Sequence, residues 1–197
     1  KGAEKMNRTT PFLALLLVMA ATPALAHTGV GAVHGLEHGF LHPLTGPDHL
    51  LAMLAVGLWS GQQSGKSVWL WPAAFVGAMI LGGLLGLAGV EMPGMEAMIL
   101  GSVIVLGALT LFGVVLPRWA GAAIVAAFAV SHGMAHGLEM PADGGGAAYF
   151  AGFAVATALL HAAGIGIALA GTRNGRPILA RASGGVCCAA GLLLAVL

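Results

Sequence analysis

The chain has 197 residues, of which 58% are hydrophobic and only 8% charged, and its formal net charge is +1. This composition indicates a polytopic membrane protein and excludes a soluble globular domain. Because the sequence has no basic patch, nucleic acid is excluded as a partner, and the lipid bilayer is the expected one.

Residues 1–26 have the form of a secretory signal peptide. Basic residues precede the apolar stretch of residues 12–21, and residues 24–26 read Ala-Leu-Ala, the small-residue pattern of a signal peptidase site. Residues 1–5 precede the first methionine, and we interpret them as an upstream extension. The mature chain is then expected to begin at His27, the alternative being an uncleaved first helix.

The predicted mature N-terminus is rich in histidine. Residues 27–40 read HTGVGAVHGLEHGF, which is too polar to span a membrane. His27 offers an imidazole beside the new terminal amine, and His34 and His38 lie one turn apart if this stretch is helical. We expect the segment to lie outside the membrane and to capture metal ions, the alternative being a tolerated polar leader.

The remainder of the chain predicts an all-α bundle that forms one transmembrane domain. We expect six membrane-spanning helices, over residues 40–60, 68–90, 96–116, 119–138, 147–171 and 178–197. Three of the connecting loops contain every basic residue of the mature chain: Lys66, Arg118, Arg173, Arg176 and Arg181. The positive-inside rule therefore predicts that these loops are cytoplasmic. Both ends of the mature chain are then periplasmic, in the inner membrane of a bacterium.

The opposite loops are acidic. The carboxylates on that side, together with the one in the histidine-rich segment, are Glu91, Glu96, Glu139, Asp143 and Glu37. They are weak topological signals, but they concentrate cations at the outer face.

The stretch HPLTGPDHLLAM, residues 42–53, places two histidines and an aspartate among helix-breaking residues. The apolar run that follows ends near Trp59 and is too short for a bilayer core, which takes roughly 20 residues. The span must reach back to Phe40, so Asp48 lies within the membrane. A carboxylate there costs about 2.5–3.5 kcal/mol on insertion scales and usually marks function. The alternative is a kinked helix with a buried ion pair.

The helix-breaking residues determine where a helix can begin in this stretch. Pro47 suits the first position of a helix, which Gly46 or Thr45 caps. Free backbone N–H groups at the positive end of the helix dipole then stabilise the Asp48 carboxylate.

The same helix-breaking residues determine whether the side chains of His42 and His49 can come together. In one straight helix His42 and His49 would lie about 10.5 Å apart along the axis, too far for joint ligation of one ion. Breaks at Pro43 and at residues 46–47 would fold His42 back toward Asp48 and His49.

Two further clusters lie in the fourth and fifth predicted spans. His132, His136 and Glu139 are spaced four and then three residues apart, which places them on one stripe of a helix. Two histidines at this spacing can bind one divalent ion. His161 follows Thr157 by one turn in the next span. The alternative for each membrane histidine is an interhelical hydrogen bond.

The ligand types favour a borderline divalent ion. Imidazole and carboxylate without thiolate suit nickel, cobalt or zinc, with the ion as transported substrate and no resident cofactor. Cys187 and Cys188 are adjacent and lack metal-ligand spacing, so we interpret them as packing residues. Residues 60–67 resemble a phosphate loop but lack its first glycine, so no nucleotide site is expected.

Small residues are expected to organise the bundle. The chain has 32 glycines, and both Gly82 with Gly86 and Gly133 with Gly137 have the GxxxG spacing that permits close helix packing in lipid.

The stretches HPLTGPDHLLAMLAVGLWSG, SHGMAHGLE and ATALLHAAGIG together resemble the HupE/UreJ family of nickel and cobalt permeases. The resemblance spans the mature chain. It implies a transporter rather than an enzyme, with His42, Asp48 and His49 as transport residues. His132, His136 and Glu139 match the later motif. The spacing between His42 and Asp48 is one residue longer than in the nickel-cobalt transporter signature.

Two other interpretations use the same residues. An intramembrane zinc-dependent hydrolase would hold zinc with His and Asp and activate a water. A haem-binding electron carrier would use facing histidines. The sequence leaves open the choice between nickel, cobalt and zinc, the coupling ion, and whether the chain forms a homo-oligomer.

Overall fold

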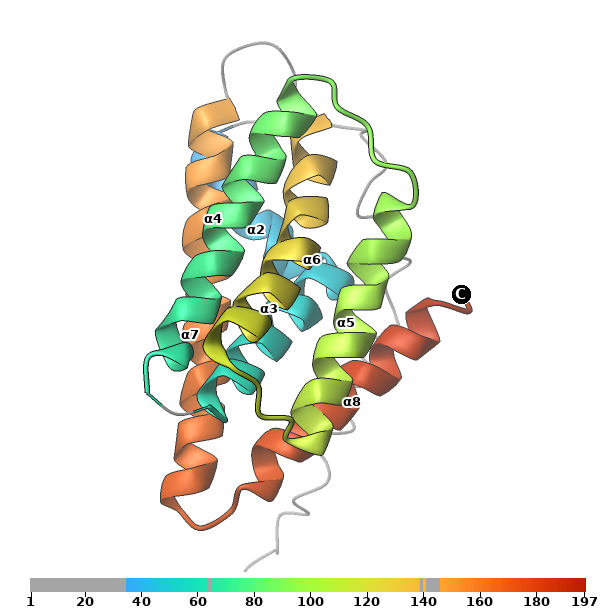
Figure 1. Ribbon diagram of the computed structural model, residues 1–197. Helices are drawn as coiled ribbons and strands as arrows, with labels where there is room; N and C mark the ends of the chain where they lie inside the picture. Colours follow the sequence, from blue (N-terminus) through green and yellow to red (C-terminus); the bar gives the residue numbers. More distant parts are fainter. Residues whose placement is uncertain (1–34, 64, 139, 141–145) are drawn as a thin grey trace, which may run out of the picture.

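The computed structural model describes residues 35–63, 65–138, 140 and 146–197, and within these residues every regular element is a helix. The helices are α2 (Gly35–Thr45), α3 (Pro47–Gly61), α4 (Ser67–Leu87), α5 (Met95–Phe112), α6 (Arg118–Leu138), α7 (Gly146–Arg173) and α8 (Ile178–Leu194) (Figure 1). The all-α prediction is therefore confirmed. The expected signal peptide and several expected metal ligands, His27, His34 and Glu139, lie outside the described residues.

The last five predicted spans correspond to α4 to α8, and each helix begins within one residue of its predicted start. The third predicted span ends earlier than expected, at Phe112 rather than at residue 116. Gly113 adopts a left-handed conformation with φ of 62° and closes α5 there, a role for which glycine carries no steric penalty.

The first predicted span, residues 40–60, is divided into two helices. α2 begins at Gly35, inside the histidine-rich segment, and α3 begins at Pro47. Gly46 separates them in an extended conformation, and Pro47 occupies the first helical position, as predicted. Pro43 lies inside α2, so the expected break at that residue is wrong.

α3 is the central helix of the bundle. It contacts α4, α5, α7 and α8, and nearly all of its residues are buried. An apolar helix enclosed on all sides forms the core on which the other helices pack. The polar residues at its first turn are therefore held inside the protein rather than in lipid.

The two GxxxG pairs pack against each other between α4 and α6. A Cβ on Gly133 would overlap the Met79 carbonyl oxygen, and one on Gly82 would overlap the Val130 carbonyl oxygen. Gly137 is equally close to the Gly83 carbonyl oxygen. Only glycine permits this backbone approach, which sets the position of the α6 histidines relative to the rest of the bundle.

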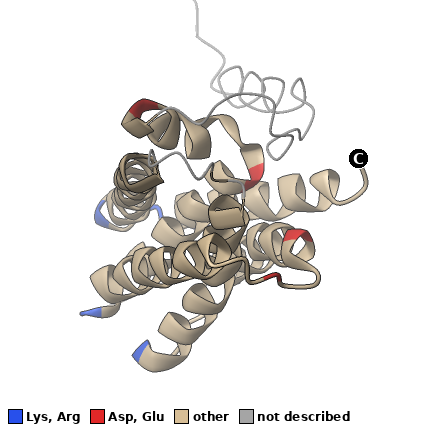
Figure 2. Ribbon diagram, turned by 90° about the horizontal axis from the view of Figure 1, so that it is seen from above, with Lys and Arg blue, Asp and Glu red and all other residues tan. Residues whose placement is uncertain are grey.

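The protein is a multi-pass membrane protein. Four of its helices, α4 to α7, are long and apolar enough to cross a membrane, whereas α8 is a shorter apolar helix. Seen from above, only a few positions along the described helices and loops carry Lys, Arg, Asp or Glu (Figure 2). Large apolar side chains such as Leu84, Val155 and Leu159 are exposed on those flanks, as a lipid-facing surface requires.

One end of the bundle is tightly packed by two tryptophans. The rings of Trp59 and Trp71 lie 4.4 Å apart. The Trp59 indole N–H donates to the Val114 carbonyl at 2.8 Å, and the Trp71 indole N–H donates to the Arg118 carbonyl at 2.9 Å. This is the end at which α4, α6 and α8 begin and α7 ends, which is the predicted cytoplasmic end (Figure 1).

Candidate metal centre

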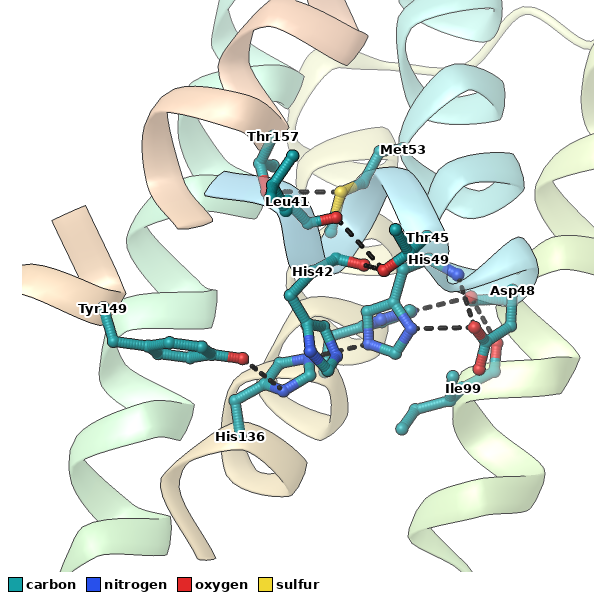
Figure 3. Close-up of polar contacts among 12 residues, drawn as sticks. Leu41, His42, Thr45, Asp48, His49, Met53, Ile99, His136, Tyr149 and Thr157 are labelled. Carbon is teal, nitrogen blue, oxygen red and sulfur yellow. Dashed lines mark hydrogen bonds and ion pairs between the residues drawn. The ribbon is translucent and has the colours of Figure 1, made fainter. Parts of the chain in front are cut away.

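Three imidazoles from three helices converge near the other end of α3. His42 comes from α2, His49 from the first turn of α3 and His136 from the last turn of α6 (Figure 3). One nitrogen from each lies within 4.8 Å of the others, and the Nε2 atoms of His49 and His136 are 2.8 Å apart. His49 and His136 are almost fully buried. This set is the strongest candidate for an ion site in the described part of the chain.

The turn at Gly46 brings His42 and His49 together. Their ring centroids lie 5.6 Å apart, compared with about 10.5 Å along the axis of one straight helix. The Gly46 N–H still donates to the His42 carbonyl at 3.0 Å, so the chain turns without losing that hydrogen bond. The predicted return of His42 toward His49 is confirmed, although Gly46 alone provides the break.

α2 is held against α7 by two glycines. A Cβ on Gly39 would overlap the Tyr149 carbonyl oxygen, and one on Gly152 would overlap the Leu36 carbonyl oxygen. This close packing places His42 beside the His136 ring, with centroids 4.5 Å apart.

Asp48 lies behind His49 rather than among the three imidazoles. Its Oδ1 atom accepts from the His49 backbone N–H at 2.8 Å and lies 2.9 Å from His49 Nδ1. A carboxylate in this position fixes the tautomer and orientation of a metal-binding histidine. This contact suits a positioning role for Asp48, which the sequence had indicated as a ligand.

The contacts fit one order of protons when Asp48 is ionised and His49 is neutral. In that state His49 donates through Nδ1 to the carboxylate and presents a lone pair at Nε2. His136 then donates from its own Nε2 to His49. The Tyr149 hydroxyl lies 3.4 Å from His136 Nδ1 and donates to it in this arrangement. The chain of donors runs from Tyr149 to Asp48 (Figure 3).

His132 lies beside the three-imidazole cluster. Its ring is 4.8 Å from that of His49, and its Nε2 atom is 3.0 Å from the Ser102 hydroxyl. The predicted stripe of His132 and His136 on one helix is confirmed. The backbone of α6 packs mainly on α4, and its two histidines reach His49 through their side chains.

Two further predicted ligands within the described residues lie apart from this cluster. His38 is exposed on α2, one turn before His42. His161 is buried in α7 beside the Phe75 ring rather than beside the three imidazoles.

Sequence reasoning missed the aromatic side chains around the imidazoles. Tyr149 is the single tyrosine of the chain, and Phe153, one turn later in α7, packs on His136 with ring centroids 4.4 Å apart. A lone tyrosine at the head of an apolar span is a usable signal for a hydrogen-bonding role. The contact of Ser102 with His132 had no comparable signal, since serine is common in membrane helices.

Comparison with known proteins gives one consistent result. The sequence model described as HupE / UreJ protein matches residues 15–194. A relative named Protein HupE, from Rhizobium leguminosarum bv. viciae, is 40% identical over 193 residues, which cover 98% of this chain and 99% of the relative. No solved structure matches significantly.

Proposed function

Since the chain belongs to the HupE/UreJ family, which comprises metal permeases rather than enzymes, we propose that it imports nickel or cobalt across the bacterial inner membrane. The ion binds between His42, His49 and His136. The observation that carries this proposal is the convergence of three imidazoles from three helices, within 4.8 Å of one another, in the interior of an apolar bundle. Family membership argues against the hydrolase interpretation of the same residues.

The donor set suits a borderline divalent ion. Imidazole nitrogens are ligands of nickel, cobalt and zinc. The three nitrogens lie within 4.8 Å of one another, close enough to share one ion after small side-chain movements. Three protein ligands leave positions open for water, which keeps the ion exchangeable.

Binding of the ion requires a rearrangement of protons. His136 must give up its Nε2 proton before that nitrogen can bind a metal. The Tyr149 hydroxyl can either donate or accept, so His136 can carry its proton on Nδ1 instead and donate it to Tyr149. Tyr149 thus allows His136 to bind the ion as a neutral ligand.

The remaining features complete the import path. In our proposal the signal peptide is cleaved after residue 26, and six spans follow with both mature ends in the periplasm. His27, His34 and His38 capture the ion at the acidic outer face, and His132 and Glu139 lie along its path. Transport is secondary or channel-like, since the sequence offers no nucleotide site.

Uptake of radiolabelled nickel and cobalt into cells that lack their own carriers tests this function. We expect His49→Gln and His136→Gln to abolish uptake at wild-type protein levels, because each removes a ligand while leaving a polar side chain. Asn174→Gln is the matched control, because it replaces one exposed polar side chain in the α7–α8 connection and leaves the three imidazoles untouched. Near-normal uptake by both histidine variants would refute the proposed site.

A further inference from the structure

His161 is a buried histidine that is not part of the three-imidazole centre. It lies in the middle of α7 with 1% of its surface exposed. Neither of its ring nitrogens has a hydrogen-bond partner among the described residues. A buried polar group without a partner is costly and rare, and such a group commonly indicates an ion or water at that position.

Two thioethers lie on the same side of α7 as His161. Thr157, one turn earlier on that face, has its hydroxyl 3.2 Å from the Met53 sulfur and 3.9 Å from the Met79 sulfur. Both methionines are fully buried, one from α3 and one from α4. Thr157 and His161 are four residues apart on one face of α7, so the unpartnered imidazole and the two sulfurs lie against the same face of that helix.

The backbones of α3 and α7 are pressed together at this level. A Cβ on Gly57 would overlap the His161 carbonyl oxygen, and one on Gly164 would meet the Leu54 carbonyl oxygen at 2.5 Å. His161 is therefore fixed against α3, the helix that also carries His49.

A single aromatic ring separates His161 from the outer histidines. The Phe75 ring lies 5.7 Å from that of His132 and 5.1 Å from that of His161. His132 in turn lies 4.8 Å from His49. The order from the three-imidazole centre toward the tryptophan-packed end is thus His49, His132, Phe75 and His161.

We propose that His161, with the thioethers of Met53 and Met79, forms a second, inner station for the transported ion. This proposal rests on the proposed import function and deepens it. One imidazole with two neutral thioethers binds a borderline ion such as nickel more weakly than three imidazoles do, because thioethers prefer softer ions. Weak binding suits an ion that must be passed on rather than retained. Phe75 separates the two stations, so the ion passes it only when that ring moves.

Equilibrium binding of nickel to the purified full-length protein in detergent tests the proposal. We expect the wild type to bind one ion per chain more than His161→Gln does, and His161→Gln to bind its tightest ion as strongly as the wild type does. His49→Gln is the complementary variant, because it weakens the outer centre and leaves His161 in place. X-ray absorption at the nickel edge of the doubly loaded protein should show sulfur neighbours.

A double variant tests the inner station even if His161→Gln fails to fold. Met53→Leu with Met79→Leu keeps the apolar volume and removes both sulfurs. It should raise the dissociation constant of the second ion at least tenfold and abolish the sulfur signal.

The outcomes separate the inner station from the import function. Equal numbers of bound ions in the wild type and His161→Gln overturn the inner station and leave the outer centre intact. No ion in folded His161→Gln places His161 in the single site, which also overturns a second station. No nickel bound to the wild type overturns the import function itself.

Discussion

The substitution Asp48→Asn tests whether the Asp48 carboxylate orients His49 or binds the ion itself. The carboxylate accepts from the His49 backbone N–H at 2.8 Å and from its ring at 2.9 Å. Asparagine keeps the shape and one acceptor oxygen but loses the charge. A hydrogen bond to a charged group contributes about 1.5–3 kcal/mol, and loss of a carboxylate that orients a metal-binding histidine typically costs about 10- to 100-fold in affinity.

We therefore expect Asp48→Asn to raise the dissociation constant for nickel about 10- to 100-fold without abolishing binding, because His49 remains. Uptake should be nearly lost at low nickel concentration and recover when nickel is raised, whereas His49→Gln should not recover. Isothermal titration of the purified proteins and concentration-dependent uptake measure both effects. If Asp48→Asn is as damaging as His49→Gln at every nickel concentration, Asp48 is itself a ligand and the positioning role is refuted.

Three other sets of substitutions test separate parts of the molecule. Gly133→Ala should destabilise the protein by about 1–3 kcal/mol, because its Cβ overlaps the Met79 carbonyl oxygen. Thermal unfolding in detergent measures this loss of stability. Gly77→Ala is the control that should not destabilise the protein, because its added Cβ meets no atom within 4 Å. Equal unfolding temperatures of the two variants would argue against the α4–α6 packing. Tyr149→Phe should weaken nickel binding by roughly two- to tenfold, since it removes one neutral hydrogen bond worth about 0.5–1.5 kcal/mol, and an unchanged binding isotherm would exclude the role assigned to its hydroxyl. Replacing His27, His34 and His38 together by glutamine should raise the nickel concentration for half-maximal uptake and spare the maximal rate; a lower maximal rate at unchanged half-saturation would count against capture.

Local features of the chain were predictable from sequence because they depend on neighbouring residues. Pro47 fits the first position of a helix wherever it occurs, and the spacing of His132 and His136 fixes them to one helix face. The starts of α4 to α8 followed from loops that carry the few polar and charged residues.

The relations between helices were not predictable in this way. The GxxxG pairs predicted close packing, but that Gly82 and Gly133 serve the same interface depends on the three-dimensional arrangement. Pro43 is accommodated in a short helix, although proline alone predicted a break. Asp48 turns toward the His49 ring, and this side-chain orientation could not be predicted from the spacing of the residues.

The burial of α3 could not be predicted from the sequence either. An apolar helix of 15 residues reads the same whether it faces lipid or protein. Only the packing of α4, α5, α7 and α8 around it shows that its first turn, with Asp48 and His49, lies inside the protein.

The most direct test of the three-imidazole centre is X-ray absorption of the purified protein loaded with less than one equivalent of nickel, so that the tightest site alone is filled. We predict about three imidazole ligands in the wild type and about two in His42→Gln or His136→Gln, with the remaining positions filled by lighter oxygen ligands such as water. An imidazole count that is unchanged in both variants would show that the ion binds elsewhere, and would contradict a centre built from His42, His49 and His136.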